Sequence, residues 1–221
     1  MGDWEATLER EAARYADGEA RLPDARDEDQ RQRQLTRLGN AAYGAGLCAL
    51  MLGDDGAARE WLGRAAARWR ESFATAPPGS WGRPLGAVKA YLLAGRLPAA
   101  EEAARWALET GAADAESPIG RYAACLALLV LGRDPEARVH ADVIRIHPDF
   151  PKEVGDALAM IAAGTDEVGY VEAIEAVLES FETRDEYLED VPVADTVLVL
   201  QALAEQRDLE AKLRSPLLPG G

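Results

Sequence analysis

The sequence predicts an all-α protein of about ten helices with no sheet. Its commonest residues include alanine, leucine, glutamate and arginine, which are strong helix formers. Apolar residues recur at steps of three and four, as at Ala58, Leu62 and Ala65. No segment shows the sustained alternation of apolar and polar residues that is typical of strands. Because 48% of the 221 residues are apolar, the chain can form a core without disulfides or metals.

Glycine and proline mark the ends of the expected helices. The breaks fall at residues 53–56, 77–79, 95–98, 132–135, 147–151 and 164–166, and at Pro192. Ser80 and Ser117 are expected N-caps, because a serine oxygen accepts hydrogen bonds from free backbone N–H groups at a helix start. Pro98 and Pro135 suit the first turn of a helix, where the missing N–H has no cost.

Two more helices are expected at the ends of the chain. An amphipathic acidic helix carries Trp4, Leu8 and Tyr15 within residues 3–35. The last helix, near residues 193–206, is apolar nearly all round, which predicts burial from several sides.

The breaks also reveal a repeat that aligns Gly53, Gly95, Gly132 and Gly164. Similar residues, mostly small, recur at fixed offsets from each glycine. They are Gly46, Val88, Cys125 and Ala157 seven before; Ala58, Ala100, Ala137 and Gly169 five after; Leu62, Ala104, Ala141 and Ala173 nine after; and Ala65, Ala107, Ile144 and Ala176 twelve after. Unit spacings of 42, 37 and 32 residues predict an array of helix hairpins that approach closely at these places.

This pattern resembles the tetratricopeptide-repeat (TPR) family, with degenerate repeats, over residues 35–181. The resemblance implies a right-handed α-α superhelix of stacked antiparallel hairpins. We expect a single domain over 1–221. It consists of an N-terminal helix and polar stretch (1–34), four hairpin repeats (35–181), and an acidic loop, apolar capping helix and tail (182–221).

The resemblance also implies a concave groove lined by the first helix of each hairpin. The candidate groove residues are Tyr43, Leu47, Leu85, Lys89, Leu92, Tyr122, Leu126 and Leu158. The family's clamps for peptide carboxylates use lysine, arginine and asparagine, and only Lys89 and Asn40 remain here, so that activity is not expected. Either the helix near 193–206 fills this apolar groove as core, or the groove receives a partner helix or an apolar ligand.

The charge is strongly acidic and unevenly distributed. The formal net charge of −15 argues against a phosphate-tracking nucleic-acid binder, which needs a basic face. Residues 166–195 hold eleven acids and one base. Within them lies a candidate acidic contact loop of Arg184, Asp185, Glu186, Tyr187, Glu189 and Asp190. The loop is either a solvated face or a contact for a basic partner. The acidic balance also fits adaptation to a salty cytoplasm or ordinary composition.

The sequence carries no enzymatic motif, and we expect no cofactor and no metal. The only histidines, His140 and His147, lie about 10 Å apart along a helix, too far for one ion. Gly82 and Gly86 bracket Arg83, but no strand precedes them, so a phosphate loop is not expected. Neither a signal peptide nor an apolar run long enough for a membrane is visible.

These observations predict a cytoplasmic, non-enzymatic scaffold or adaptor that binds a protein or peptide, with no nucleic-acid or membrane partner. Cys48 and Cys125 lie in apolar stretches, which favours a reducing compartment. Two alternatives stay open. One is binding of a small apolar ligand in a groove closed by the C-terminal helix, and the other is an acidic inhibitor of a basic partner.

Overall fold

The computed structural model describes residues 3–220, and within that range the chain is all-α, with ten α-helices and no strand. This confirms the predicted fold class. The helices are α1 (Trp4–Arg21), α2 (Glu28–Met51), α3 (Asp55–Phe73), α4 (Gly82–Leu93), α5 (Leu97–Glu109), α6 (Pro118–Val130), α7 (Asp134–Ile144), α8 (Lys152–Ala163), α9 (Glu167–Glu182) and α10 (Asp195–Glu205). Three short 3-10 helices, η1 (Leu22–Asp24), η2 (Ala112–Asp114) and η3 (Leu188–Asp190), lie in the connections.

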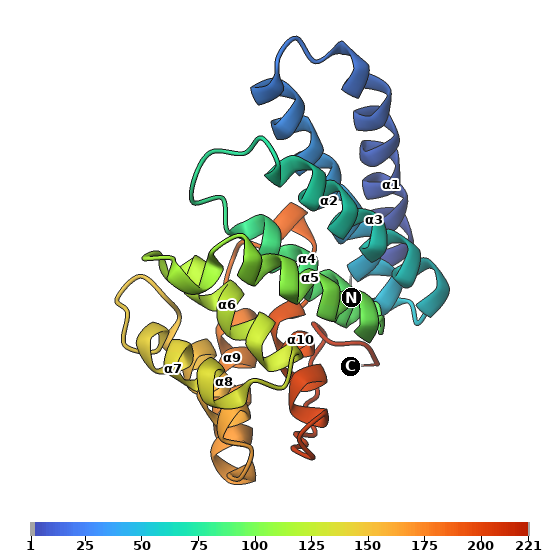
Figure 1. Ribbon diagram of the computed structural model, residues 1–221. Coiled ribbons are helices and arrows are strands. Elements are labelled where there is room, and N and C mark those ends of the chain that lie inside the picture. The colour runs from blue at the N-terminus through green and yellow to red at the C-terminus, as the bar shows by residue number, and fades with distance from the viewer. Residues whose placement is uncertain (1–2, 221) are drawn as a thin grey trace.

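Each helix from α1 to α9 packs against the next one in the chain. Helices α1–α3 occupy one end of the molecule, α6–α9 the other, and α4 and α5 lie between them (Figure 1). Helix α10 departs from this order, because it returns to pack against α4, α8 and α9. The C-terminal segment therefore joins the middle of the molecule to its far end.

The aligned glycines end the first helix of each hairpin in a similar way. Gly53, Gly95, Gly132 and Gly164 all have φ between 61° and 72°, a left-handed conformation that favours glycine. At Gly53, Gly95 and Gly132 the glycine N–H and the next N–H both bond back to carbonyls of the last turn. These two hydrogen bonds together form a Schellman motif, which provides donors for the carbonyl groups at the end of the helix. At Gly164 a single bond runs to the carbonyl of Met160.

The expected helix starts are confirmed except at one serine. Ser117 accepts a hydrogen bond from the N–H of Gly120 at 3.1 Å, and Pro98 and Pro135 lie in first turns. The prediction for Ser80 is wrong, because α4 begins one residue later, after Trp81, without a side-chain cap. The Ser80 hydroxyl donates instead to the carbonyl of Pro77 at 2.7 Å, inside the preceding turn.

Close helix approach occurs at some of the small positions. A Cβ built at Gly46 would lie 2.6 Å from the side chain of Leu62, so α2 and α3 can meet only at a glycine there. The Cys125 thiol lies 3.4 Å from the carbonyl of Ala137 between α6 and α7. The fourth unit differs, because Ala176 is exposed while Ile174 and Val177 are buried.

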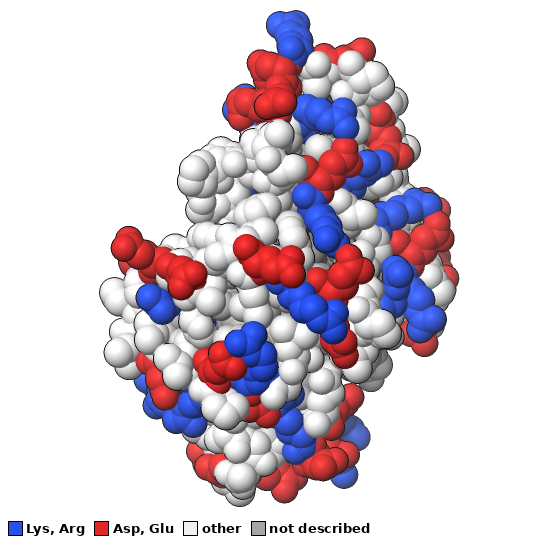
Figure 2. Space-filling model, viewed as in Figure 1, with Lys and Arg blue, Asp and Glu red and all other residues white. Residues whose placement is uncertain are grey.

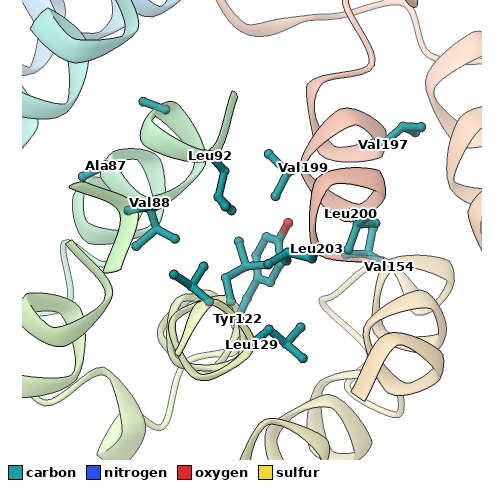
Figure 3. Packing of buried hydrophobic residues seen from close by; sticks show 14 of the residues in the cluster. Ala87, Val88, Leu92, Tyr122, Leu129, Val154, Val197, Val199, Leu200 and Leu203 are labelled. Atoms are coloured by element: carbon teal, nitrogen blue, oxygen red, sulfur yellow. The ribbon is translucent and has the colours of Figure 1, made fainter. Parts of the chain in front are cut away.

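The core between the hairpins is completed by α10. Val199, Leu200 and Leu203 of α10 are fully buried, and Figure 3 shows this helix facing Leu92 of α4 and Tyr122 of α6. The all-round apolar character of this segment thus reflects contacts on several sides. Helix α10 therefore packs against candidate groove residues as part of the core, as in one of the two alternatives that the sequence left open.

The surface is highly charged on the face shown in Figure 2, where acidic and basic side chains intermingle. An uncharged area lies over the loop of residues 74–81 between α3 and α4, whose sequence contains no charged residue. Within residues 3–220, the helices are all too short or too polar to cross a membrane.

Candidate ligand-binding cavity

A cavity of about 360 Å³ lies between α2, α3 and α4, next to the segment that leads into α10. Its lining residues are Thr36, Asn40, Tyr43, Trp69, Ser80, Gly82, Arg83, Leu85, Gly86, Lys89, Leu188 and Asp195. Spacings of three and four residues place the lining side chains of α2 on one face of that helix. The lining residues of α4 have similar spacings and also share one face. The loop at residues 74–81 and η3 contribute to its rim.

A charged cluster of Lys89, Asp195 and Tyr43 joins three helices at this cavity. The Lys89 ammonium lies 2.6 Å from a carboxylate oxygen of Asp195, and the Tyr43 hydroxyl donates to the same oxygen at 2.7 Å. Lys89 also donates to the hydroxyl of Thr196 at 3.1 Å. The side chains of Lys89 and Asp195 are only 12% and 16% exposed, so this pair is shielded from solvent more than a surface ion pair is.

The cluster shifts the pKa values of its acids in opposite directions. Burial by itself raises the pKa of Asp195, but the Lys89 ammonium, the Tyr43 hydroxyl and a backbone N–H outweigh it and hold that pKa below its ordinary value. Burial, together with the charge of Asp195, raises the pKa of Tyr43 well above its ordinary value. Asp195 is therefore an anion and Tyr43 a neutral donor at neutral pH.

Arg83 supplies a second cation to the cavity, and its partners are all neutral. Its Nε donates to Ser72 at 2.9 Å, and its Nη2 donates to Gln32 at 2.6 Å and to Thr36 at 3.0 Å. Among residues 3–220 no carboxylate pairs with it, and its Nη1 has no hydrogen-bond acceptor. Partial burial without a counter-ion lowers the pKa of Arg83.

Trp69 forms an apolar wall and is fixed between two glycines. A Cβ at Gly39 of α2 would lie 2.5 Å from its ring, and a Cβ at Gly86 of α4 would lie 2.7 Å from it. Its indole N–H donates to the Asn40 amide oxygen at 3.1 Å, and its ring packs against Tyr43 at 5.3 Å between centroids. The two glycines therefore set the width of the slot that holds the indole.

Helix α1 holds η3 against the cavity. Glu189 pairs with Arg14, accepts from the Asn40 amide at 3.1 Å, and offers its carbonyl to Arg10 at 3.0 Å. Glu189 and Asp190 have φ of 55° and 56°, a left-handed conformation that is costly for residues with a Cβ. These contacts oppose that cost and place Leu188, half exposed, at the cavity rim.

The structure divides the eight candidate groove residues into two sets. Tyr43, Leu85 and Lys89 line the cavity. The other five are buried in the core: Leu47, Leu92, Tyr122, Leu126 and Leu158. The Tyr122 ring packs edge-on against Phe150 at 5.3 Å between centroids.

The candidate acidic loop is likewise divided. Arg184 stacks on the ring of Phe181 at 3.5 Å, and the Tyr187 hydroxyl donates to the Phe181 carbonyl at 2.6 Å. Glu189 is occupied by its contacts with α1 and α2, as described above. The remaining three, Asp185, Glu186 and Asp190, are exposed to solvent.

Histidines and cysteines do not gather in the described part of the chain. Among residues 3–220 no group of three or more histidine, cysteine, aspartate or glutamate side chains is placed to hold a metal ion. His140 is half-buried, and burial lowers its pKa. Cys48 and Cys125 are free and buried, and burial raises the pKa of the Cys48 thiol to about 11.

Sequence reasoning missed Arg83, Trp69 and Asp195 as cavity residues. Asp195 was part of the acidic stretch 166–195, and nothing local distinguishes it from its neighbours. A usable signal did exist on α4, where Arg83 and Lys89 interrupt an otherwise apolar helix. Such charges on a helix buried by its neighbours require partners or a cavity.

Comparison of the chain with protein-family models, with curated proteins and with solved structures finds no match. The cavity and its chemistry are therefore the observations from which a function can be inferred.

Proposed function

We propose that this is a non-enzymatic binding protein that holds a small ligand in the cavity between α2, α3, α4 and the start of α10. The lining carries the proposal. Trp69, Leu85 and Leu188 offer apolar surface, and a few fixed polar groups stand among them, within a volume of about 360 Å³. Small-ligand sites commonly have this size and this mixture of groups.

The charged cluster supports binding rather than proton transfer. A general acid or base works best with a pKa near the working pH. The pKa of Asp195 lies below its ordinary value and that of Tyr43 well above, so both move away from neutrality. The two groups and Lys89 are better suited to closing the cavity than to chemistry within it.

The buried helix α10 favours this ligand site over a peptide groove. Leu126 and Leu158 are fully buried, and α10 packs across α4, α8 and α9. We therefore propose the alternative in which the C-terminal segment closes a site for a small ligand. Its ligand differs from a purely apolar one, because Arg83, Lys89 and Asn40 line the cavity.

We also propose that the helices form a TPR-like repeat and that the protein is cytoplasmic. Shared helix-end geometry at Gly53, Gly95 and Gly132 supports the repeat. Two buried free thiols, Cys48 and Cys125, support a reducing compartment.

A fragment screen tests the proposed function. Small neutral, anionic and cationic fragments are screened by saturation-transfer NMR on the full chain, and hits are measured by calorimetry. Leu85→Trp fills the cavity from α4, so we expect it to weaken every hit by at least about tenfold, or 1.4 kcal/mol.

Leu52→Trp is the matched control, because Leu52 is 42% exposed and lies outside the cavity lining. It should leave the affinities unchanged. The proposed function is wrong if no fragment binds, or if hits bind Leu85→Trp as tightly as the original protein.

A further inference from the structure

The cations of the cavity outnumber its anions. Arg83 and Lys89 line it, and Asp195 is the single carboxylate among its lining residues. Asp195 is paired with Lys89, which leaves the charge of Arg83 uncompensated. This excess of one positive charge stands out in a protein whose formal net charge is −15.

Carboxylates beside the partners of Arg83 and beside the rim residue Leu188 are paired with other arginines. Asp29, which accepts a hydrogen bond from Gln32, pairs with Arg33. Glu71, one residue before the Arg83 partner Ser72, pairs with Arg31 and Arg68. Glu189 pairs with Arg14. No ion pair within residues 3–220 includes Arg83, so its charge remains available to an anion from outside the chain.

The geometry of Arg83 is fixed by its neighbours. Thr36, Ser72 and Gln32 hold its Nε and Nη2, and Nη1 keeps its two N–H groups free. A guanidinium held in this way loses little side-chain freedom when it binds a ligand. The two free N–H groups of Nη1 can donate hydrogen bonds to a carboxylate oxygen. A neutral oxygen would leave the positive charge without a counter-ion.

The other walls define the rest of the ligand. Trp69, held between Gly39 and Gly86, presents a rigid aromatic surface, and Leu85 and Leu188 extend it. One uncompensated charge beside this apolar surface matches a monoanion with an apolar body better than a dianion such as a phosphate ester. Aromatic bodies gain in addition from contact with a fixed indole ring.

We propose that the ligand is a small organic monocarboxylate with an aromatic body. Its carboxylate lies at Nη1 of Arg83 and its ring lies against Trp69. This inference rests on the proposed function, because it names the ligand class for the same cavity. It also gives Arg83 the role of selecting acids over their neutral analogues.

The experiment compares three acids with their primary amides at neutral pH by calorimetry. The probes are benzoate, 3-phenylpropionate and 2-naphthoate, each beside its amide. A hydrogen bond to a charged group predicts that an acid binds about 10- to 100-fold more tightly than its amide. Arg83→Gln should remove this preference while binding of the amide persists.

Arg26→Gln is the matched control, because it removes the same charge from an exposed arginine outside the cavity. It should keep the acid preference. Circular dichroism verifies that each variant is folded. If Arg83→Gln does not fold, the comparison of acids and amides on the original protein still tests whether the cavity prefers a carboxylate.

Failure of this inference is distinct from failure of the proposed function. The carboxylate assignment is wrong if acids and amides bind with equal affinity, or if neutral or cationic fragments bind and no acid does. Either result leaves the proposed binding site in place. An acid preference that survives in Arg83→Gln also overturns it. If no fragment of any class binds, both proposals are wrong.

Discussion

The ion pair of Lys89 and Asp195 shows why a shielded charge depends on its partner. Asp195→Asn leaves the Lys89 ammonium largely buried without a counter-ion and weakens the bond from Tyr43. We expect a loss of about 2–4 kcal/mol in the free energy of unfolding, measured by urea denaturation at neutral pH. Lys89→Met combined with Asp195→Asn should cost less than Asp195→Asn alone, since no unpaired charge then remains. A loss below about 0.5 kcal/mol for Asp195→Asn would place this pair with weak surface pairs.

The same pair predicts a pH dependence with a definite sign. Because the pKa of Asp195 is lowered in the folded state, its contribution is fully present above the ordinary aspartate pKa of about 3.9. It is lost as the pH falls through the folded pKa. The difference in stability between the original protein and Asp195→Asn should therefore be constant from neutral pH to about pH 5, and shrink below about pH 4. A difference that grows on acidification would contradict this.

Two glycines of α4 allow a direct test of the slot that holds Trp69. A Cβ at Gly86 would lie 2.7 Å from the indole, whereas a Cβ at Gly82 meets nothing within 4 Å. Gly86→Ala should destabilise the protein by about 1–3 kcal/mol through overpacking, although alanine favours helices. Gly82→Ala, the matched control, should be neutral or stabilising. Chemical denaturation followed by tryptophan fluorescence measures both. Equal effects of the two substitutions would show that Trp69 moves freely.

At the scale of elements, the link between α1 and η3 controls the cavity rim. Arg14→Gln removes the ion pair with Glu189 and one of the two arginines that bind the buried Glu11. We expect faster amide hydrogen exchange over residues 187–191, because the left-handed conformation of Glu189 and Asp190 then has fewer contacts to oppose its cost.

Arg33→Gln is the control for this prediction, since Arg33 pairs with Asp29 one turn away on an exposed helix face. Its effect on exchange over residues 187–191 should be nil. Unchanged exchange in Arg14→Gln would mean that η3 is held by the Asn40 and Arg10 contacts alone.

The helices could be predicted from the sequence where their pattern is local. The cavity could not be predicted in this way. Helix period and the glycines at 53, 95 and 132 depend on residues within one or two turns, so the all-α class and several boundaries followed from the sequence. The cluster at Asp195 depends on contacts across 106 residues to Lys89 and 152 to Tyr43. No local pattern encodes such pairings. Even Ser80, next to the cavity, was misassigned because a turn carbonyl captured its hydroxyl.

At the scale of the whole molecule, the C-terminal segment is part of the core. Asp195 binds Lys89 and Tyr43, and the Ala194 N–H bonds to the carbonyl of Leu217 at 2.9 Å. Arg207 pairs with Asp134 and donates to the carbonyl of Leu129 at 2.7 Å. These contacts connect the last thirty residues with α2, α4, α6 and α7, so the stability of both ends of the molecule depends on that segment.

Deletion of residues 192–221 should therefore abolish the native core. The four buried residues Val197, Val199, Leu200 and Leu203 alone contribute roughly 6–12 kcal/mol by burial. That amount is comparable to the total stability of a typical domain, about 5–15 kcal/mol. We expect the truncated chain to lose near-UV circular dichroism and to bind a hydrophobic dye, since Leu92 and Leu126 become exposed. Removal of residues 219–221 alone, the control, should change neither signal. A truncated chain that stays folded, monomeric and free of dye would show that α10 does not cover the groove, and the cavity proposal would then lose the helix that supplies Asp195.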